Sequence, residues 1–281
     1  MISGQGPNPQ NQADCQIFSD FVSTGIAQPY GQLIGQGCVF PATTETVANQ
    51  LQTAGLTWRG YMEDMPSPCS HPAINTQDTT QTATPTSEYA TRHNPFVYFH
   101  PFIDTPSCAA NDVPLTQLQT DLASPKTTPN LVYIVPNLCN DGHDSLCANG
   151  RPGGLVAIDN WLQKWVPIIL NSPAYNKGGM LVVTFDEADY NSAGSYDATS
   201  CCDEMPGPNS PTPGITGPGG GRVGAVVLSP FNKPGTVNSN GYNHYALLKT
   251  VETLFGLPYL GYAQPTGLAP FGADVFNNFR K

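Results

Sequence analysis

The chain has 281 residues and a formal net charge of −10, and charged side chains make up only 11% of it, against about 25% in an average soluble domain. No apolar run approaches the roughly 18 residues that a membrane helix needs, so we expect no transmembrane segment. The acidic balance supplies no continuous basic surface, which disfavours nucleic acid as a partner. The length suits one large α/β domain or two small ones.

The cysteines indicate the compartment. There are eight, spread along the chain without the paired C-x2-C spacing of a zinc ribbon. With low charge and many Pro and Gly residues, this usage is typical of an exported, extracytoplasmic protein. Cys139 and Cys147 form the best local pair, whereas the adjacent Cys201 and Cys202 are expected to bond to different partners. The sequence starts without the charged and apolar regions of a signal peptide, so it is either a mature form or a chain missing its front.

The first 93 residues contain one predicted helix–strand unit between two turn-rich stretches. Residues 1–42 are polar and rich in turn formers. The pattern over residues 43–62 predicts a short helix, capped by Thr43, and then a strand. Residues 63–93 are rich in Pro, Ser and Thr and predict a surface loop.

The rest of the chain alternates between predicted strands and helices. Apolar segments predict three buried strands, at 131–137, 180–189 and 223–228. Apolar residues at helical spacing predict two helices, at 154–171 and 243–255, the second capped by Asn243 and ended by Gly256. Such alternation predicts a mostly parallel sheet covered on both faces. We therefore expect a single α/β domain, with residues 190–221 as a long loop.

Two polar clusters follow the predicted strands, at the sheet edge where ligands bind in parallel α/β folds. The first contains Asn137, Asn140, Asp141, His143 and Asp144, and the second contains Asp186, Glu187 and Asp189. Adjacent carboxylates repel one another unless a proton or cation offsets them, and a hard divalent cation with oxygen ligands is the economical explanation. One such cluster alone would suit a solvated acidic loop, but two at one edge favour a binding site.

Three further positions are candidates for binding a phosphate group. His143 has the chemistry of a ligand, a phosphate donor or a general acid. His244, at the start of the last predicted helix, suits an anion or a metal as well as a plain surface position. Arg92 and His93 are adjacent, and such a pair can receive a phosphate. No G-x-S-x-G elbow, P-loop or H-E-x-x-H motif is present.

Five segments in order resemble motifs of one known family. PNLCNDGHD resembles the PNxxNDxHD segment of secreted phosphoesterases of the acid phosphatase and phospholipase C type, and LVVTFDEAD resembles their strand-end metal motif. GYMEDMPSPC, RHNPFVYF and NHYALLKTVETLFGLPYLGYA also match in order and spacing. The resemblance runs from about residue 2 to residue 270. It implies an alkaline phosphatase-like fold, which is a three-layer α/β/α arrangement with a mostly parallel central sheet.

The resemblance also implies roles for single residues. Asp186 and Glu187 would hold a divalent cation, with Asp189 close by, and calcium, magnesium and zinc all remain open. His143, with Asp144, would bind or protonate near the phosphate, and His93 would contact the phosphoryl oxygens. The other positions implied at the substrate are Asn140, Asp141, Arg92 and His244. Glu63 and Asp64 lie in a family motif as well, and for them we expect a structural role.

The start of the sequence bears on activity. In the family, a metal-binding Glu-Asn pair and a Ser or Thr nucleophile precede a segment resembling ISGQ, which lies here at residues 2–5. The resemblance thus implies that these elements, with the first strand, lie before Met1. We expect the 281-residue chain by itself to bind metal weakly and to hydrolyse little phosphoester.

The function predicted from the sequence is metal-assisted hydrolysis of phosphate monoesters by a secreted, monomeric acid phosphatase-like enzyme. Its substrate would be a small phosphate ester or a phospholipid head group. Two alternatives stay open, a phospholipase C-type phosphodiesterase and a catalytically incomplete binding or surface protein on the same scaffold.

Overall fold

A three-stranded parallel sheet organises the larger part of the chain. The computed structural model describes residues 1–143, 146–188, 197–200, 202, 204–214 and 217–278. In this sheet β3 (Trp58–Met62) lies between β4 (Asp112–Pro114) and β5 (Leu131–Val135), and both neighbours run parallel to it. Met62 is paired with Val135, so the carboxyl ends of β3 and β5 lie side by side. The segments that follow these two strands therefore start at the same edge.

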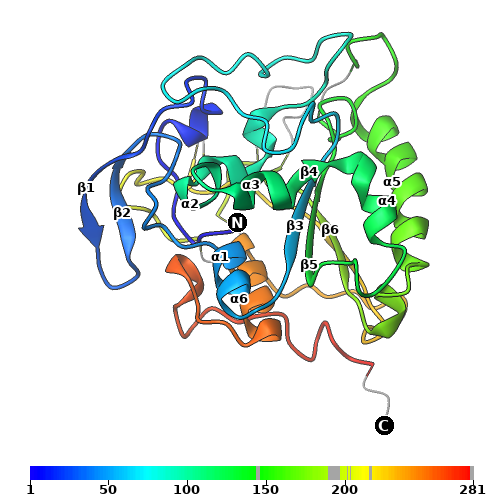
Figure 1. Ribbon diagram of the computed structural model, residues 1–281. Coiled ribbons are helices and arrows are strands. Elements are labelled where there is room, and N and C mark those ends of the chain that lie inside the picture. The colour runs from blue at the N-terminus through cyan, green and yellow to red at the C-terminus, as the bar shows by residue number, and fades with distance from the viewer. Residues whose placement is uncertain (144–145, 189–196, 201, 203, 215–216, 279–281) are drawn as a thin grey trace.

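Helices cover both faces of this sheet (Figure 1). On one face Tyr61, Val132 and Ile134 pack with Trp165 of α5 (Gly154–Leu170), and Leu118 of α4 (Leu118–Asp121) joins the same cluster. The other face carries the larger core, to which α1 (Val47–Thr53), α2 (His100–Ile103), α3 (Pro106–Asn111) and α6 (His244–Phe255) contribute side chains. The predicted α/β class is confirmed.

Aromatic rings fill the larger core at the centre of β3. Trp58 stacks on Phe96 with 4.5 Å between ring centroids, and it also contacts Phe102. Gly60 leaves room for this packing, because a Cβ there would lie 2.6 Å from the Phe96 ring. Any side chain at Gly60 would push the aromatic core away from the sheet.

The other strands form two antiparallel pairs. β1 (Val22–Ala27) and β2 (Gln32–Gln36) make a hairpin within the stretch that we expected to be only polar and turn-rich. β6 (Leu181–Thr184) and β7 (Ala225–Leu228) confirm the predicted strands, but they pair with each other in an antiparallel sheet of their own. The expected single, mostly parallel sheet is thus replaced, in the described part of the chain, by three separate sheets. β7 runs in the opposite direction along β6, with Leu181 opposite Leu228 and Thr184 opposite Ala225.

The two long predicted helices are present at their expected places, and their caps follow the sequence in most cases. Asn243 caps α6, since its side-chain oxygen accepts from the Ala246 N–H at 2.9 Å, and Gly256 ends it with φ +66°. The cap of α1 is Thr46 and not Thr43. Thr46 and Asn49 exchange side-chain and main-chain hydrogen bonds in a capping box, which a hydroxyl three residues earlier cannot form.

Among the described residues, three disulfides join segments of the chain: Cys15–Cys38, Cys69–Cys108 and Cys139–Cys147. The last confirms the local pair predicted from the sequence. Cys201 lies outside the described residues, so the expectation about its pairing stays a prediction. Among the helices of the described chain, none has the length and apolar character to cross a membrane.

Candidate active site

The first polar cluster forms a tight turn directly after β5. The Asn137 side-chain oxygen accepts from the main-chain N–H groups of Cys139 and Asn140, at 3.1 and 3.0 Å. The N–H of His143 donates to Asp141 Oδ1 at 2.8 Å, and the His143 side chain is exposed. Short-range bonds thus shape the turn and leave the imidazole at the surface.

The second cluster follows β6, where Asp186 and Glu187 are exposed. Partial burial raises the pKa of Glu187, and the negative charges of Asp186 and Asp14 add to this effect. The His143 imidazole opposes them and lowers the pKa of Glu187. Asp186, Asp14 and His143 therefore each lie within electrostatic range of Glu187. Asp14 was not expected from the sequence, because it lies far from any strand end.

The two clusters are adjacent although β5 and β6 belong to different sheets. Gly142, in the first turn, has φ +94°, and a Cβ there would lie 3.0 Å from the ring of Phe185, the residue before Asp186. Ile158 of α5 also packs against Gly142, where a Cβ would lie 3.3 Å from its side chain. The structure thus brings the 137–143 turn against the segment that carries Asp186 and Glu187.

His244 joins the second cluster from the first position of α6. Its Nε2 donates to the main-chain oxygen of Asp186 at 2.6 Å, so that nitrogen carries the hydrogen. Burial lowers the pKa of His244, while the bond to Asp186 opposes this effect. The neutral imidazole is thereby favoured, with its Nδ1 as the acceptor nitrogen. In this structure the His244 side chain therefore holds the main chain at Asp186 by a hydrogen bond.

Arg92 and His93 lie in a 3₁₀ helix, Thr91–His93, on another segment. The Arg92 guanidinium donates to the main-chain oxygen of Gln81 at 2.8 Å and to its side-chain oxygen at 3.3 Å. His93 is half-buried, and its main-chain N–H donates to Ala90. Arg92 is thus engaged with the 63–93 loop, and its role at the substrate stays a prediction. Asp144 and Asp189 lie outside the described residues.

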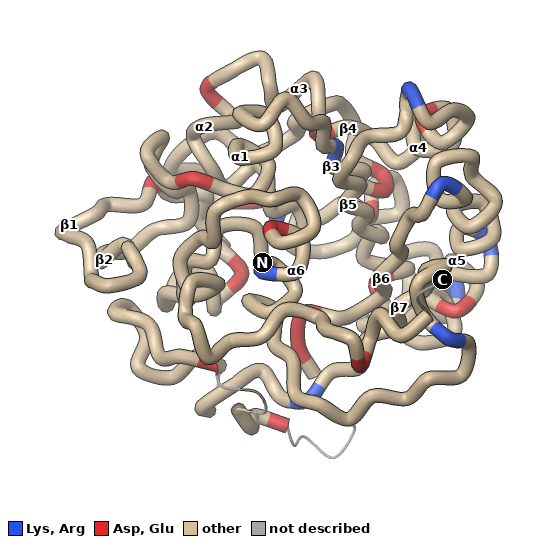
Figure 2. Tube along the Cα trace, turned by 90° about the horizontal axis from the view of Figure 1, so that it is seen from below, with Lys and Arg blue, Asp and Glu red and all other residues tan. Residues whose placement is uncertain are grey.

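The charge distribution leaves few cations for an anionic ligand. Figure 2 shows that much of the chain is uncharged and that several of the Lys and Arg residues lie along the α5 side. Arg151 precedes α5 in the chain, and its guanidinium is 3.4 Å from the Glu88 carboxylate. Near the second cluster, Arg222 follows Gly220 and Gly221, which lie against Glu187 and Ala188. A phosphate at the two clusters could therefore be neutralised by this arginine as well as by histidine, amide groups or a bound cation.

Two carboxylate-containing groups are candidate cation sites. Glu88, Cys139 and Cys147 place their ligand atoms within 4.8 Å of one another, but the two sulfurs are bonded to each other and offer no thiolate. Asp186 and Glu187 fit better. Partial burial is the main cause of the raised pKa of Glu187, and the neighbouring charge of Asp186 adds to it. A hard cation would offset that charge, and both side chains supply the oxygen ligands that such a cation prefers.

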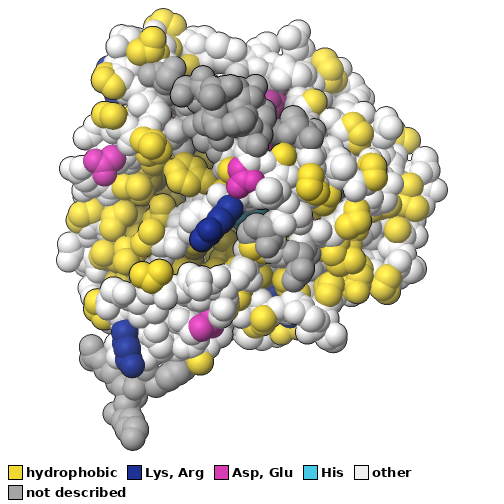
Figure 3. Space-filling model, turned by 180° about the vertical axis from the view of Figure 1, so that it is seen from behind, with side chains coloured by type: hydrophobic (Ala, Val, Ile, Leu, Met, Phe, Trp, Pro, Cys, Tyr) yellow, Lys and Arg dark blue, Asp and Glu magenta, His cyan; other side chains and the backbone are white. Residues whose placement is uncertain are grey.

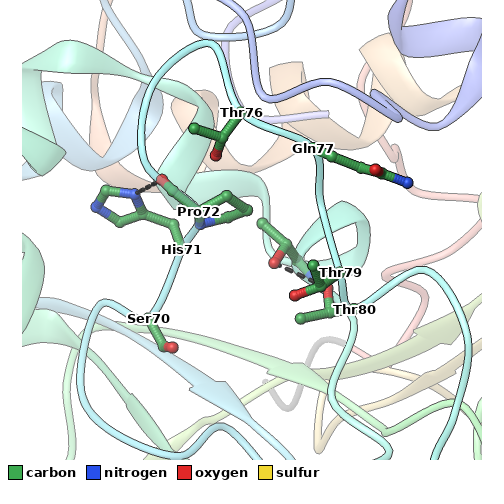
Figure 4. A pocket seen from close by; sticks show the side chains of 8 residues that line it. Ser70, His71, Pro72, Thr76, Gln77, Thr79 and Thr80 are labelled. Atoms are coloured by element: carbon green, nitrogen blue, oxygen red, sulfur yellow. Dashed lines mark hydrogen bonds between the residues drawn. The ribbon is translucent and has the colours of Figure 1, made fainter.

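A cavity of about 350 Å³ lies apart from these clusters, within the 63–93 loop (Figure 4). Hydroxyl groups dominate its lining, which consists of Ser70, His71, Pro72, Thr76, Gln77, Thr79, Thr80 and Thr91. His71 donates from Nδ1 to the main-chain oxygen of Pro72 at 2.7 Å and stacks on Phe18. None of the residues predicted for the active site lines this cavity.

The sequence comparisons agree with the motifs. The model of the Phosphoesterase family matches residues 21–258, and the chain therefore belongs to this family. The resemblance inferred from the sequence is thereby confirmed.

Over the aligned residues, curated relatives are about a quarter identical to the chain. An acid phosphatase of Aspergillus fumigatus is 25% identical over 251 residues, which are 84% of this chain and 47% of the relative. A phosphatidylinositol-3-phosphatase of Mycobacterium tuberculosis is 27% identical over 86% of this chain and 67% of its own length. Phospholipase C A of the same bacterium is 27% identical over 46% of this chain and 26% of its own. The chain spans about half the length of the acid phosphatases that it matches.

Proposed function

We propose that this protein hydrolyses phosphate monoesters with the assistance of a divalent cation, as a secreted monomer. The observation that carries the proposal is the contact between the 137–143 turn and the Phe185–Glu187 segment, which joins both polar clusters into one site. We further propose that residues 1–281 belong to a single domain of the three-layer, alkaline phosphatase-like type. The helices on both faces of the β4–β3–β5 sheet support that arrangement.

In the proposed site, the segment after β6 binds the cation and the 137–143 turn contacts the phosphate. Asp186 and Glu187 would hold the cation, together with Asp189. Such a cation, when bound, polarises the phosphoryl group and lowers the pKa of the attacking oxygen. His143, at the surface of the facing turn, would donate a hydrogen bond to a phosphoryl oxygen or a proton to the leaving group. Asp144 and His93 are proposed to assist it.

The remaining residues orient these groups. Asn140, Asp141 and Arg92 are proposed as contacts to the substrate, and His244 keeps the main chain at Asp186 in place by its hydrogen bond. Burial lowers the pKa of His244, which favours its neutral form.

A phospholipase C-type diesterase is the second candidate, and one observation favours it. Figure 3 shows broad hydrophobic areas with few charged side chains on the back of the molecule. Beside the proposed site, Phe185 is 42% exposed, and Leu155 and Val156 at the start of α5 are 73% and 58% exposed. Apolar side chains around a phosphoester site suit a substrate with an acyl chain. A binding protein without turnover is the third candidate.

The experiment compares hydrolysis of p-nitrophenyl phosphate and of phosphatidylcholine. Since the chain spans about half the length of its acid phosphatase relatives, both the 281-residue chain and a form extended by the sequence encoded upstream are assayed, with Mg²⁺, Ca²⁺ or Zn²⁺ added. We expect the extended form to hydrolyse p-nitrophenyl phosphate, and D186N and H143A each to lower its rate at least a hundredfold. D159N, which alters an exposed carboxylate on α5, is the matched control.

The outcomes separate the candidates. Preference for phosphatidylcholine would replace the monoesterase with the diesterase, and turnover of neither ester by either form would favour a binding protein. A near-normal rate in D186N or in H143A would remove that residue from its proposed role.

A further inference from the structure

A cluster of three carboxylates that the proposed mechanism does not use surrounds Asn137, the first residue of the 137–143 turn. We propose that Glu63 is a positioning residue of the active site, which holds Asn140 in place for the phosphate. The inference rests on the proposed function, because Asn140 is a proposed substrate contact.

Glu63 joins the ends of two parallel strands. It directly follows β3, and its main-chain N–H donates to Val135, the last residue of β5, at 3.0 Å. One oxygen of its carboxylate, Oε2, accepts from the main-chain N–H of Asn137 and from the side-chain amide of Asn140, both at 3.0 Å. A single carboxylate oxygen thus fixes the beginning and the fourth residue of the turn.

Asn137 is held by two further carboxylates. The residue is 4% exposed, and its side-chain nitrogen donates to Asp64 at 2.7 Å and to Glu88 at 3.3 Å. Its side-chain oxygen accepts the two turn N–H groups described above. Both ends of the Asn137 amide are therefore used, which fixes its orientation.

Glu88 fastens the far end of the same loop. Its main-chain oxygen accepts from the Leu138 N–H at 2.9 Å, and its Oε1 accepts from the Ala148 N–H at 3.2 Å. The Cys139–Cys147 disulfide closes the loop between these two points. The loop is thus anchored at both ends, and the bond from Glu63 to Asn140 controls a side chain inside it.

The bond to Glu63 also decides what Asn140 can offer to a ligand. One N–H of its amide is committed to Glu63, so the amide plane is fixed and the other N–H and the oxygen keep set directions. A Gln at position 63 has the same size as Glu, but one of the two carboxylate oxygens is replaced by an NH2 group, which donates and does not accept. A Gln oxygen can still accept from Asn137 or Asn140, but it lacks the charge that strengthens both bonds.

The experiment is a double-mutant cycle with E63Q and N140A, read out by the affinity for inorganic phosphate from amide chemical shifts. Hydrogen exchange of the amides at 137–143 is measured on the same samples, and E45Q, which alters an exposed glutamate, is the matched control. We expect E63Q to speed this exchange at least tenfold and to weaken phosphate binding at least fivefold. We expect E45Q to change neither.

The cycle distinguishes positioning from general stability. If Glu63 acts through Asn140, the double variant binds phosphate no more weakly than N140A alone. Independent effects that multiply in the double variant, or unchanged exchange in E63Q, would overturn the inference and leave the proposed function standing. A wild-type chain and extended form that both fail to bind phosphate would overturn the proposed function, and this inference with it. A circular-dichroism melt of each variant confirms that the folded protein is being compared.

Discussion

The imidazole of His244 lies 2.6 Å from the main-chain oxygen of Asp186, which links the start of α6 to the end of β6. The two residues are 58 positions apart in the sequence, and no hydrogen-bonded strand pair connects their segments in the described chain. The hydrogen bond therefore supplies a local tether for the first of the two carboxylates proposed to hold the cation.

H244A removes this tether, and we expect it to lower hydrolysis of p-nitrophenyl phosphate at least tenfold, because Asp186 loses its fixed main-chain position. The rate is measured in the form that shows activity, at saturating metal. H71A, which removes a histidine at the separate cavity, should keep the wild-type rate. Equal losses in both variants would show that the effect is not specific to the site.

The raised pKa of the buried Asp112 carboxyl predicts that the protein loses stability as the pH rises. The carboxyl is wholly buried, and burial raises its pKa from 3.8 to about 7, although the hydrogen bond from Asn94 opposes the shift. Between these two pH values the unfolded chain releases the proton and the folded chain keeps it, so the free energy of unfolding decreases from about pH 4 to pH 7. The contribution of Asp112 is constant below and above that window.

D112N should remove that part of the pH dependence. One pKa unit corresponds to about 1.4 kcal/mol. The free energy of unfolding of D112N, relative to that of wild type, should therefore be higher at pH 8 than at pH 4 by about 4 kcal/mol at most. Urea unfolding at the two pH values measures it, with D159N as the exposed control. An unchanged slope of stability against pH in D112N would contradict the assignment.

The raised pKa of His100 predicts a second loss of stability at higher pH. Its imidazole lies between two carboxylates, with Nε2 2.8 Å from Asp20 and Nδ1 2.9 Å from Asp104. Partial burial lowers the pKa of His100, but the two bonds outweigh this effect and the pKa is raised above 6.5. The bonded, charged form therefore stabilises the fold fully below about pH 6.5, and this contribution is lost as the pH rises through the higher folded pKa.

H100Q should lower stability at pH 5 and have little effect at pH 9. Because both aspartates are exposed to solvent, we expect a difference of about 1 kcal/mol or less. Thermal melts of H100Q and wild type at both pH values measure it. A loss of the same size at pH 9 would show that packing, and not charge, accounts for it.

The Cys139–Cys147 disulfide closes a loop with a sequence separation of eight residues. Replacing both residues in C139A/C147A relaxes this constraint in the unfolded chain, and we expect the free energy of unfolding to fall by about 2–3 kcal/mol. Urea unfolding measures the change, after mass analysis has shown that the remaining disulfides are intact. Unchanged stability would mean that the hydrogen bonds of Glu63, Asp64 and Glu88 are sufficient to hold this loop.

The sequence by itself determined the local elements and supplied the candidate residues of the site. Apolar periodicity located β5, β6, α5 and α6, Asn243 and Gly256 marked the ends of α6, and the short spacing of Cys139 and Cys147 identified their disulfide. These features depend on neighbours within a few residues, so the chain order is sufficient to predict them. The expectation that a nucleophile and further metal ligands precede Met1 concerns residues outside the sequence and stays a prediction.

Only the tertiary structure decided how these parts meet. It placed β6 with β7 in an antiparallel pair, brought Gly142 against Phe185, set Asp14 within range of Glu187, and joined Glu63 and Glu88 around Asn137. Each of these relationships connects segments that lie far apart in the chain, and none leaves a local pattern of spacing or composition. Pairing direction and side-chain contact depend on which surfaces pack together in the folded molecule. For this reason the sequence could supply the candidate residues of the site but could not predict the contacts between them.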